Sequence, residues 1–186
     1  MNSFTCPHCG KSHEGDPSDW GWTLPDEVWA IPDGKRSEEA KYNTDLCKWG
    51  ERYFIRCILP IPFSDREGYF GWGVWVEVDQ QGFEAYLNIY EVDGSNEPRI
   101  SGALANKVPG YSGSEQCSVE LQFGPSDQRP MAYFTGNSSC QMAQEQTQGI
   151  DVIRYHQILQ SIRCRVKNKH NESLQPTSGR DAPCLG

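Results

Sequence analysis

The chain lacks several features that would assign it to a large class of proteins. No segment reaches the roughly 18 consecutive apolar residues that a membrane-spanning helix needs. Residues 1–10 contain neither a cationic region nor an apolar core, so we expect no secretory signal and a cytoplasmic protein. Only four of the 186 residues are histidine, which leaves few general bases for nucleophilic catalysis. The sequence therefore offers no catalytic residue that we can name.

Clustered basic residues are also scarce. The formal net charge is −8, from 25 acidic and 17 basic side chains, and an acidic surface repels the phosphate backbone of nucleic acids. The densest basic stretch runs from Arg163 to His170, and we interpret it as the solvated end of a helix, where cations suit the dipole. We therefore expect another protein as the partner, and neither nucleic acid nor a membrane. The oligomeric state cannot be predicted from these features.

The most informative motif is Cys6-Pro7-His8-Cys9-Gly10, near the start of the chain. In a reducing compartment, the eight cysteines are metal ligands, catalytic groups or core residues more often than disulfides. Two thiolates separated by two residues can reach one tetrahedral Zn²⁺. Gly10 accommodates the left-handed turn that follows the second ligand. This spacing predicts half of a structural zinc site.

The chain has no second Cys-x-x-Cys that would supply the other two ligands. We favour His13 and Cys47 as the remaining ligands, ahead of Cys140, with Cys57 as a weaker candidate. The predicted metal site is therefore Cys6, Cys9, His13 and Cys47. The alternatives are a pair of unligated thiols and a thiol–disulfide redox centre. The redox centre is disfavoured because only five residues precede Cys6, too few for the first strand of a βαβ unit.

A run of β-forming residues predicts a strand over 52–63, and alternating apolar residues predict another over 69–79. Pro60 and Pro62 have no backbone N–H, so we place them at an edge or a bulge. Weaker patterns predict strands over 101–106, 117–123 and 131–135. Helical spacing predicts helices over 80–91 and 138–149, and a further helix that begins after Asp151.

This order of elements predicts an α+β fold, with a mainly antiparallel sheet, helices packed on one face and a zinc-knuckle-like segment at the N-terminus. We expect one domain over 1–165, in which 1–12 is the metal knuckle and 13–50 is an irregular, aromatic-rich wrap with a short helix near Ser37 to Tyr42. Residues 166–186 are polar and predicted to be disordered. Trp20, Trp22, Trp29 and Trp49 either pin the wrap to the sheet, which we favour, or anchor a partner.

Several short motifs together point to one family. They are Cys6-Pro-His-Cys9-Gly10 with His13, Leu24-Pro-Asp-Glu-Val-Trp29, Asp45-Leu-Cys47, Tyr53-Phe-Ile-Arg56, Phe70-Gly-Trp-Gly-Val-Trp-Val76, Gly102-x-Leu104-x-Asn106 with Pro109-Gly-Tyr111, Arg129-Pro130, and Glu145-Gln146 with Gly149-Ile150. Over residues 4–155 the chain resembles a bacterial family catalogued as domain of unknown function 2199. The resemblance implies membership without an activity. The family has a His where this chain has Cys140; a zinc ligand tolerates that exchange, whereas a catalytic His would not.

Three functions fit these observations. The first is a non-enzymatic protein-interaction or regulatory module, for instance of the immunity type, with a structural zinc site. The second is a metal-dependent hydrolase whose open zinc site holds a water, with Asp45 or Glu145 as base. The third is nucleic-acid binding through the knuckle, which the net charge opposes. We favour the first.

Overall fold

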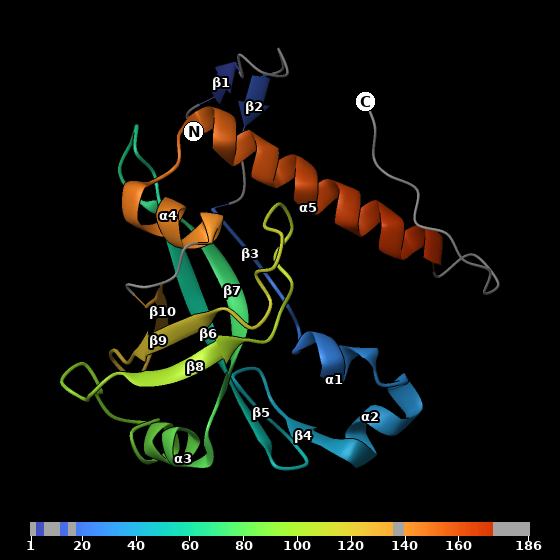
Figure 1. Cartoon of the computed structure of the whole chain (residues 1–186), viewed down its shortest axis with the longest axis vertical. Helices are drawn as coiled ribbons and strands as arrows, with labels where there is room; N and C mark the ends of the chain where they lie inside the picture. The colour runs from blue at the N-terminus through green and yellow to red at the C-terminus, as the bar shows by residue number, and fades with distance from the viewer. Residues whose placement is uncertain (1–2, 6–11, 15–17, 136–139, 173–186) are drawn as a thin grey trace.

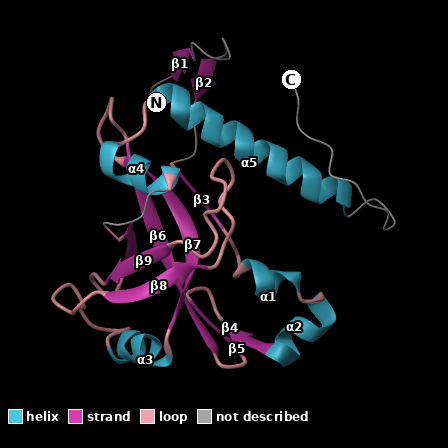
Figure 2. Cartoon of the chain, in the orientation of Figure 1, coloured by secondary structure: helices cyan, strands magenta, loops and turns pink. Residues whose placement is uncertain are grey.

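The computed structural model describes the backbone of residues 3–5, 12–14, 18–135 and 140–172, and the side chains of 18–135 and 140–163. These residues form five helices and ten strands (Figure 2). The strands are β1 (Ser3–Thr5), β2 (Ser12–Glu14), β3 (Asp19–Gly21), β4 (Ala40–Tyr42), β5 (Leu46–Trp49), β6 (Arg52–Pro62), β7 (Tyr69–Val78), β8 (Ile100–Leu104), β9 (Ser118–Gln122) and β10 (Met131–Phe134). The helices are α1 (Asp26–Ala30), α2 (Asp33–Glu39), α3 (Gln80–Asn88), α4 (Gln141–Gln148) and α5 (Val152–Glu172).

The longest sheet element is the antiparallel hairpin of β6 and β7, whose two strands were predicted from the sequence. Its ladder runs from the pair Tyr53–Val78 to the pair Pro62–Tyr69. Successive side chains point to opposite faces of a strand, and the two faces of this hairpin differ in chemistry. The inner face consists of apolar residues that are fully buried, including Ile55, Cys57, Leu59, Val74 and Val76. The outer face carries charged residues, including Arg52 and Glu77.

Five strands close into a barrel around the inner face. β7 pairs with β8, β8 with β9 and β9 with β10, all antiparallel. β10 then returns to β6 in parallel, through the pair Met131–Ile58. Outside the barrel, β5 and β4 extend from β6, while β3 joins β7 in parallel. The predicted α+β class with mainly antiparallel pairing is thus confirmed, although the sheet is closed.

The predicted packing of helices on one face is not confirmed. A closed barrel fills its inner face with side chains from its own strands, so it leaves no open apolar face for a helical layer. In Figure 1, α3 and α4 lie at opposite ends of β6, and both contact that strand. The knuckle residues Cys6 to Gly10 lie outside the described residues.

Pro60 and Pro62 lie where β6 needs no donor. Gly71, the partner of Pro60 in the ladder, donates its N–H to Ser18 and not to β6. The edge of β6 away from β7 pairs with β10 at Ile58. Beyond that point the Pro60 carbonyl accepts from the Gln146 side chain at 3.1 Å. The predicted edge position of the prolines is therefore confirmed.

Residues 13–50 are more regular than predicted, since they contain β3, α1, α2, β4 and β5. Trp20 and Trp22 pack on Trp72 of β7, with ring centroids 6.2 and 5.9 Å apart. These two rings pin the segment to the sheet. Trp29 on α1 is 44% exposed and does not share that role.

One buried cluster of apolar residues extends from Trp22 to Ile162. α5 continues to Glu172, past the predicted domain boundary at residue 165. The rest of the predicted tail, 173–186, lies outside the described residues. Among the helices that the structure describes, none is long and apolar enough to cross a membrane.

Gly102 of β8 occupies a position without space for a side chain. An added Cβ would lie 2.5 Å from Val76 Cγ1 and 2.6 Å from the Glu77 carbonyl oxygen. We expect Gly102→Ala to lower the free energy of unfolding by about 1–3 kcal/mol, because β7 and β8 must move apart. Gly34→Ala in α2, with nothing within 4 Å of an added Cβ, should be neutral or stabilising. Chemical denaturation measures the free energy of unfolding of both variants. Equal values for Gly102→Ala and Gly34→Ala would contradict this interpretation.

Candidate functional site

The structure separates two of the four predicted zinc ligands. His13 lies on β2 and Cys47 on β5, and Figure 1 places these strands at opposite ends of the long axis. Cys47 is also 1% exposed, and burial raises its pKa to about 11, which disfavours the thiolate that zinc binds. Cys6 and Cys9 lie outside the described residues, so metal binding by this pair stays a prediction.

The weaker ligand candidates are Cys57 and Cys140. Cys57 is completely buried inside the barrel, and burial raises its pKa well above the ordinary value. Cys140 is half-buried and immediately precedes α4. No group of three or more His, Cys, Asp or Glu residues that could hold a metal occurs within the described part of the chain.

The two carboxylates considered as hydrolase bases both make ion pairs. Asp45 accepts from Arg129 Nε at 2.7 Å. Glu145 accepts from Arg154 Nε at 2.7 Å and from the Tyr111 hydroxyl at 2.5 Å. The Glu145 contacts join α4, α5 and the loop after β8. Each carboxylate therefore has a structural role that accounts for its position.

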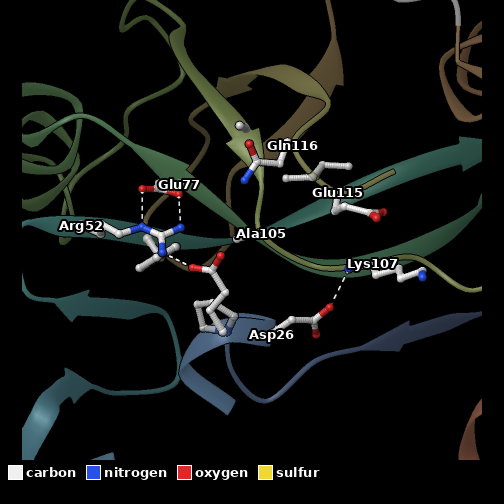
Figure 3. A pocket seen from close by; sticks show the side chains of 12 residues that line it. Asp26, Arg52, Glu77, Ala105, Lys107, Glu115 and Gln116 are labelled. Carbon is white, nitrogen blue, oxygen red and sulfur yellow. Dashed lines mark hydrogen bonds and ion pairs between the residues drawn. The ribbon is translucent and has the colours of Figure 1, made fainter. Parts of the chain in front are cut away.

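A cavity of about 300 Å³ lies on the outer face of β6, β7 and β8, beneath the first turn of α1 (Figure 3). We call it the Arg52 pocket. Its charged lining consists of four carboxylates and two cations: Asp26, Glu27, Glu77, Glu115, Arg52 and Lys107. The lining thus has an excess of negative charge.

Arg52 joins two walls of this pocket. Its guanidinium donates to both carboxylate oxygens of Glu77 on β7, at 2.7 and 2.6 Å, and also to Glu27 on α1. Its hydrogen bonds to Glu77 and Glu27 hold the pKa of Arg52 above its ordinary value. The rings of Trp49 and Phe54 flank the same guanidinium at 5.4 and 5.2 Å. Arg52 is therefore fixed in place, and it helps to hold α1 over the barrel.

Asn106 holds α1 from the other side. Its side-chain oxygen accepts the Trp75 N–H at 2.8 Å, and its amide nitrogen donates to the Leu24 carbonyl and to Asp26. The Lys107 N–H donates to the same Asp26 carboxylate at 2.7 Å, as Figure 3 shows. Asn106 is completely buried, so these bonds specify one position for the start of α1.

Two side chains of the pocket remain uncommitted. Glu115 and Gln116 make no side-chain hydrogen bond or ion pair with the residues that the structure describes, and Figure 3 draws Glu115 across the pocket from Arg52. Gln116 has φ = 68°, the only non-glycine residue in the described ranges with a positive φ. Left-handed backbone at such a residue costs of order 1–3 kcal/mol, and strain of this kind clusters at functional sites.

A second cavity of about 500 Å³, the Asp45 pocket, is lined by Asp45, Arg129, Asp127 and three tyrosines: Tyr69, Tyr86 and Tyr90. Thr44 and Tyr90 donate to the Asp45 carboxylate in addition to Arg129. The Asp45 carbonyl accepts the N–H of Arg56, and the carbonyl of Pro130 accepts that of Ile58. The ion pair therefore joins β5 to β10 along one edge of β6, which is a structural role.

We take the Arg52 pocket as the candidate functional site. Both pockets contain ion pairs that hold the fold together, and each has one carboxylate, Glu115 or Asp127, that forms no ion pair with the described residues. Only in the Arg52 pocket does that carboxylate adjoin a strained residue, Gln116. Sequence reasoning missed Arg52 and Gln116. Glu77 stands on the polar face of a predicted strand, which is a usable signal. A positive φ at Gln116 has no sequence signature, because it is imposed by the loop.

The comparisons with known proteins add one match. A profile of the bacterial family described as "Uncharacterized protein conserved in bacteria (DUF2199)" matches residues 5–150, and this confirms the resemblance found in the motifs. No curated protein and no solved structure matches the chain. The match therefore brings no activity with it.

The stability contributed by Asp45 should depend on pH. Burial alone would raise the Asp45 pKa, but hydrogen bonds from Thr44 and Arg129 outweigh it and lower the pKa below 3.8. A carboxyl group whose pKa is lower in the folded state stabilises the fold at pH values above its unfolded pKa, about 3.9. This stabilisation is lost as the pH falls towards the folded pKa. We expect Asp45→Asn to cost about 1–2 kcal/mol at neutral pH and to flatten the fall in Tm below about pH 4.

The control is Asp127→Asn, in the same pocket. Asp127 makes no hydrogen bond or ion pair with the described residues, so its Tm profile should follow the wild type. Scanning calorimetry between about pH 2 and pH 7 covers the window in which Asp45 changes charge. If Tm depended on pH in Asp45→Asn as it does in the wild type, the Asp45–Arg129 ion pair would not stabilise the connection between β5 and β10.

Proposed function

We propose that this chain, which belongs to the uncharacterised bacterial family of domain of unknown function 2199, is a non-enzymatic protein-interaction module of a regulatory or immunity type. It accepts a basic side chain of its partner in the Arg52 pocket. The observation that carries this proposal is the Glu115 carboxylate, which lines a concave site and forms no ion pair with the described residues. A lysine or arginine from a partner supplies the missing charge.

The overall charge supports a basic partner. A net charge of −8 attracts cationic surfaces over a Debye length, about 8 Å at physiological salt. Complementary charge chiefly accelerates encounter and selects between partners. The pocket adds a local contact to this general attraction, because its carboxylates outnumber its cations.

Aromatic side chains near the pocket support a protein as the partner. Trp29 lies on α1, two residues after Glu27, and is 44% exposed. The Arg36 guanidinium stacks over its ring at 4.6 Å, which limits its motion. Trp49 stands beside Arg52. Tryptophan and arginine are the residues most enriched at the energetic centres of protein interfaces.

The Cys6–Cys9 spacing remains the basis for proposing a structural zinc ion at the N-terminus, with His13 as a further ligand. A structural site supports folding and contributes no chemistry. A hydrolase would instead need three ligands and a water in the open fourth position. We place the protein in the cytoplasm, where free thiols persist.

The proposed interface predicts a strong effect of charge reversal at Glu115. Glu115→Lys places a cation where the partner's cation binds, so capture of the partner should fall at least about tenfold. The measurement is quantitative co-purification from a lysate of the source bacterium, with chemical cross-linking to identify the contacting peptide. The wild-type cross-link should join the pocket to a Lys- or Arg-bearing segment, and capture should weaken as salt rises.

The matched control is Glu67→Lys in the turn between β6 and β7. It makes the same change in net charge at an exposed residue that does not line the pocket, so it should retain most of the capture. If Glu115→Lys and Glu67→Lys lose the partner equally, general charge explains binding and the pocket does not. If neither loses it, the proposed interface is wrong.

Metal content tests the zinc proposal separately. Elemental mass spectrometry on untagged protein purified under reducing conditions should find about one zinc per chain. Cys6→Ser and Cys9→Ser should each abolish it, whereas Cys57→Ser, a buried control, should not. Metal-free wild-type protein would exclude the site.

A further inference from the structure

Two thiols meet beside the wall of the Arg52 pocket. Cys117 directly follows Gln116, and its Sγ donates to the Gly113 carbonyl at 3.2 Å. The Cys140 side chain lies close enough to this thiol to interact with it. Cys140 comes from a distant part of the chain, the residue before α4. The fold has therefore brought together two cysteines that the sequence keeps apart.

The surroundings of these thiols differ from those of the other described cysteines. Cys117 and Cys140 are half-buried, whereas Cys47 and Cys57 are 1% and 0% exposed. A small oxidant can therefore reach the pair. No third His, Cys, Asp or Glu of the described residues joins them in a metal-binding group. Their proximity thus favours a bond between the two sulfurs over coordination of a shared ion.

We propose that Cys117 and Cys140 form a reversible disulfide when the protein meets a peroxide, which makes the pair a redox modification site. This site is independent of the proposed partner. We assign Cys140, the residue that immediately precedes α4, as the attacking thiol. Cys117 is the resolving thiol. Burial raises its pKa to about 11, so it reacts only once Cys140 is activated.

The two steps balance with hydrogen peroxide as the oxidant. The Cys140 thiolate attacks one oxygen, the O–O bond breaks, and the sulfur becomes a sulfenic acid while hydroxide takes up a proton to give water. The Cys117 sulfur then attacks the sulfenic sulfur. An S–S bond forms, the S–O bond breaks, and the leaving hydroxide takes the Cys117 proton to give a second water. A dithiol reductant reverses the change.

The disulfide would join the pocket loop to α4. Residues 115 and 116 line the Arg52 pocket, and Cys117 is their immediate neighbour. Fixing the Cys117 sulfur restrains the backbone beside the strained Gln116. Oxidation should therefore slow amide hydrogen exchange over 105–117 and raise Tm by roughly 5–10 °C through closure of the 117–140 loop.

Peptide mapping of the full-length protein tests the proposal. Reduced protein is treated with hydrogen peroxide, its free thiols are alkylated, and it is digested without reductant. We expect a cross-linked pair of peptides containing Cys117 and Cys140, which dithiothreitol separates. In Cys117→Ser, dimedone should trap a sulfenic acid on Cys140. The control Cys47→Ser should still form the cross-link.

Two results would overturn the inference. One is that both thiols remain open to alkylation after peroxide has oxidised other cysteines of the chain. The other is that either thiol pairs with a different cysteine in preference. Unchanged exchange over 105–117 in the cross-linked protein would overturn the coupling to the pocket. None of these results bears on the Glu115 experiment, so the two proposals can fail separately.

Discussion

One edge of β6 pairs with two strands, β5 and β10. Closure of the barrel depends on the hydrogen bonds and the ion pair between the ends of these two strands. β5 pairs antiparallel up to Ile55, and β10 begins parallel pairing at Ile58. Between them the Asp45 and Pro130 carbonyls accept successive N–H groups of β6. The Asp45–Arg129 ion pair fastens the two strands to each other across this point. Beyond β10, where prolines supply no donor, the Gln146 side chain bonds to the Pro60 and Ala132 carbonyls.

This closure decides where chemistry can occur. The barrel interior is filled with buried apolar side chains, so polar groups gather on the outer face and at the strand junctions. Much of that polarity serves the fold: Arg52 bridges α1 and β7, Asn106 holds the start of α1, and Glu145 joins α4 to α5. The carboxylate of Glu115 has no such role among the described residues, and the proposed partner contact rests on it.

The elements of the barrel were readable from the sequence, because alternation and helical spacing report burial directly. The strands β6 and β7 and the helices α3, α4 and α5 follow from such patterns, and the edge position of Pro60 follows from its missing N–H. The wrap over 13–50 was harder. Its helices α1 and α2 are short and bury little of their own, and β3 exists through pairing with β7. Local sequence carries little signal for elements that neighbours stabilise.

The sequence by itself determined the α+β class, the family and the Cys6–Cys9 spacing, because periodicity and local motifs are properties of contiguous residues. The tertiary structure alone decided that the sheet closes, that Asp45 meets Arg129, and that Cys117 meets Cys140. It also separated β2 from β5, and hence His13 from Cys47. These outcomes depend on contacts between residues far apart in the chain, and on a backbone conformation at Gln116 that the fold imposes and side-chain identity does not specify.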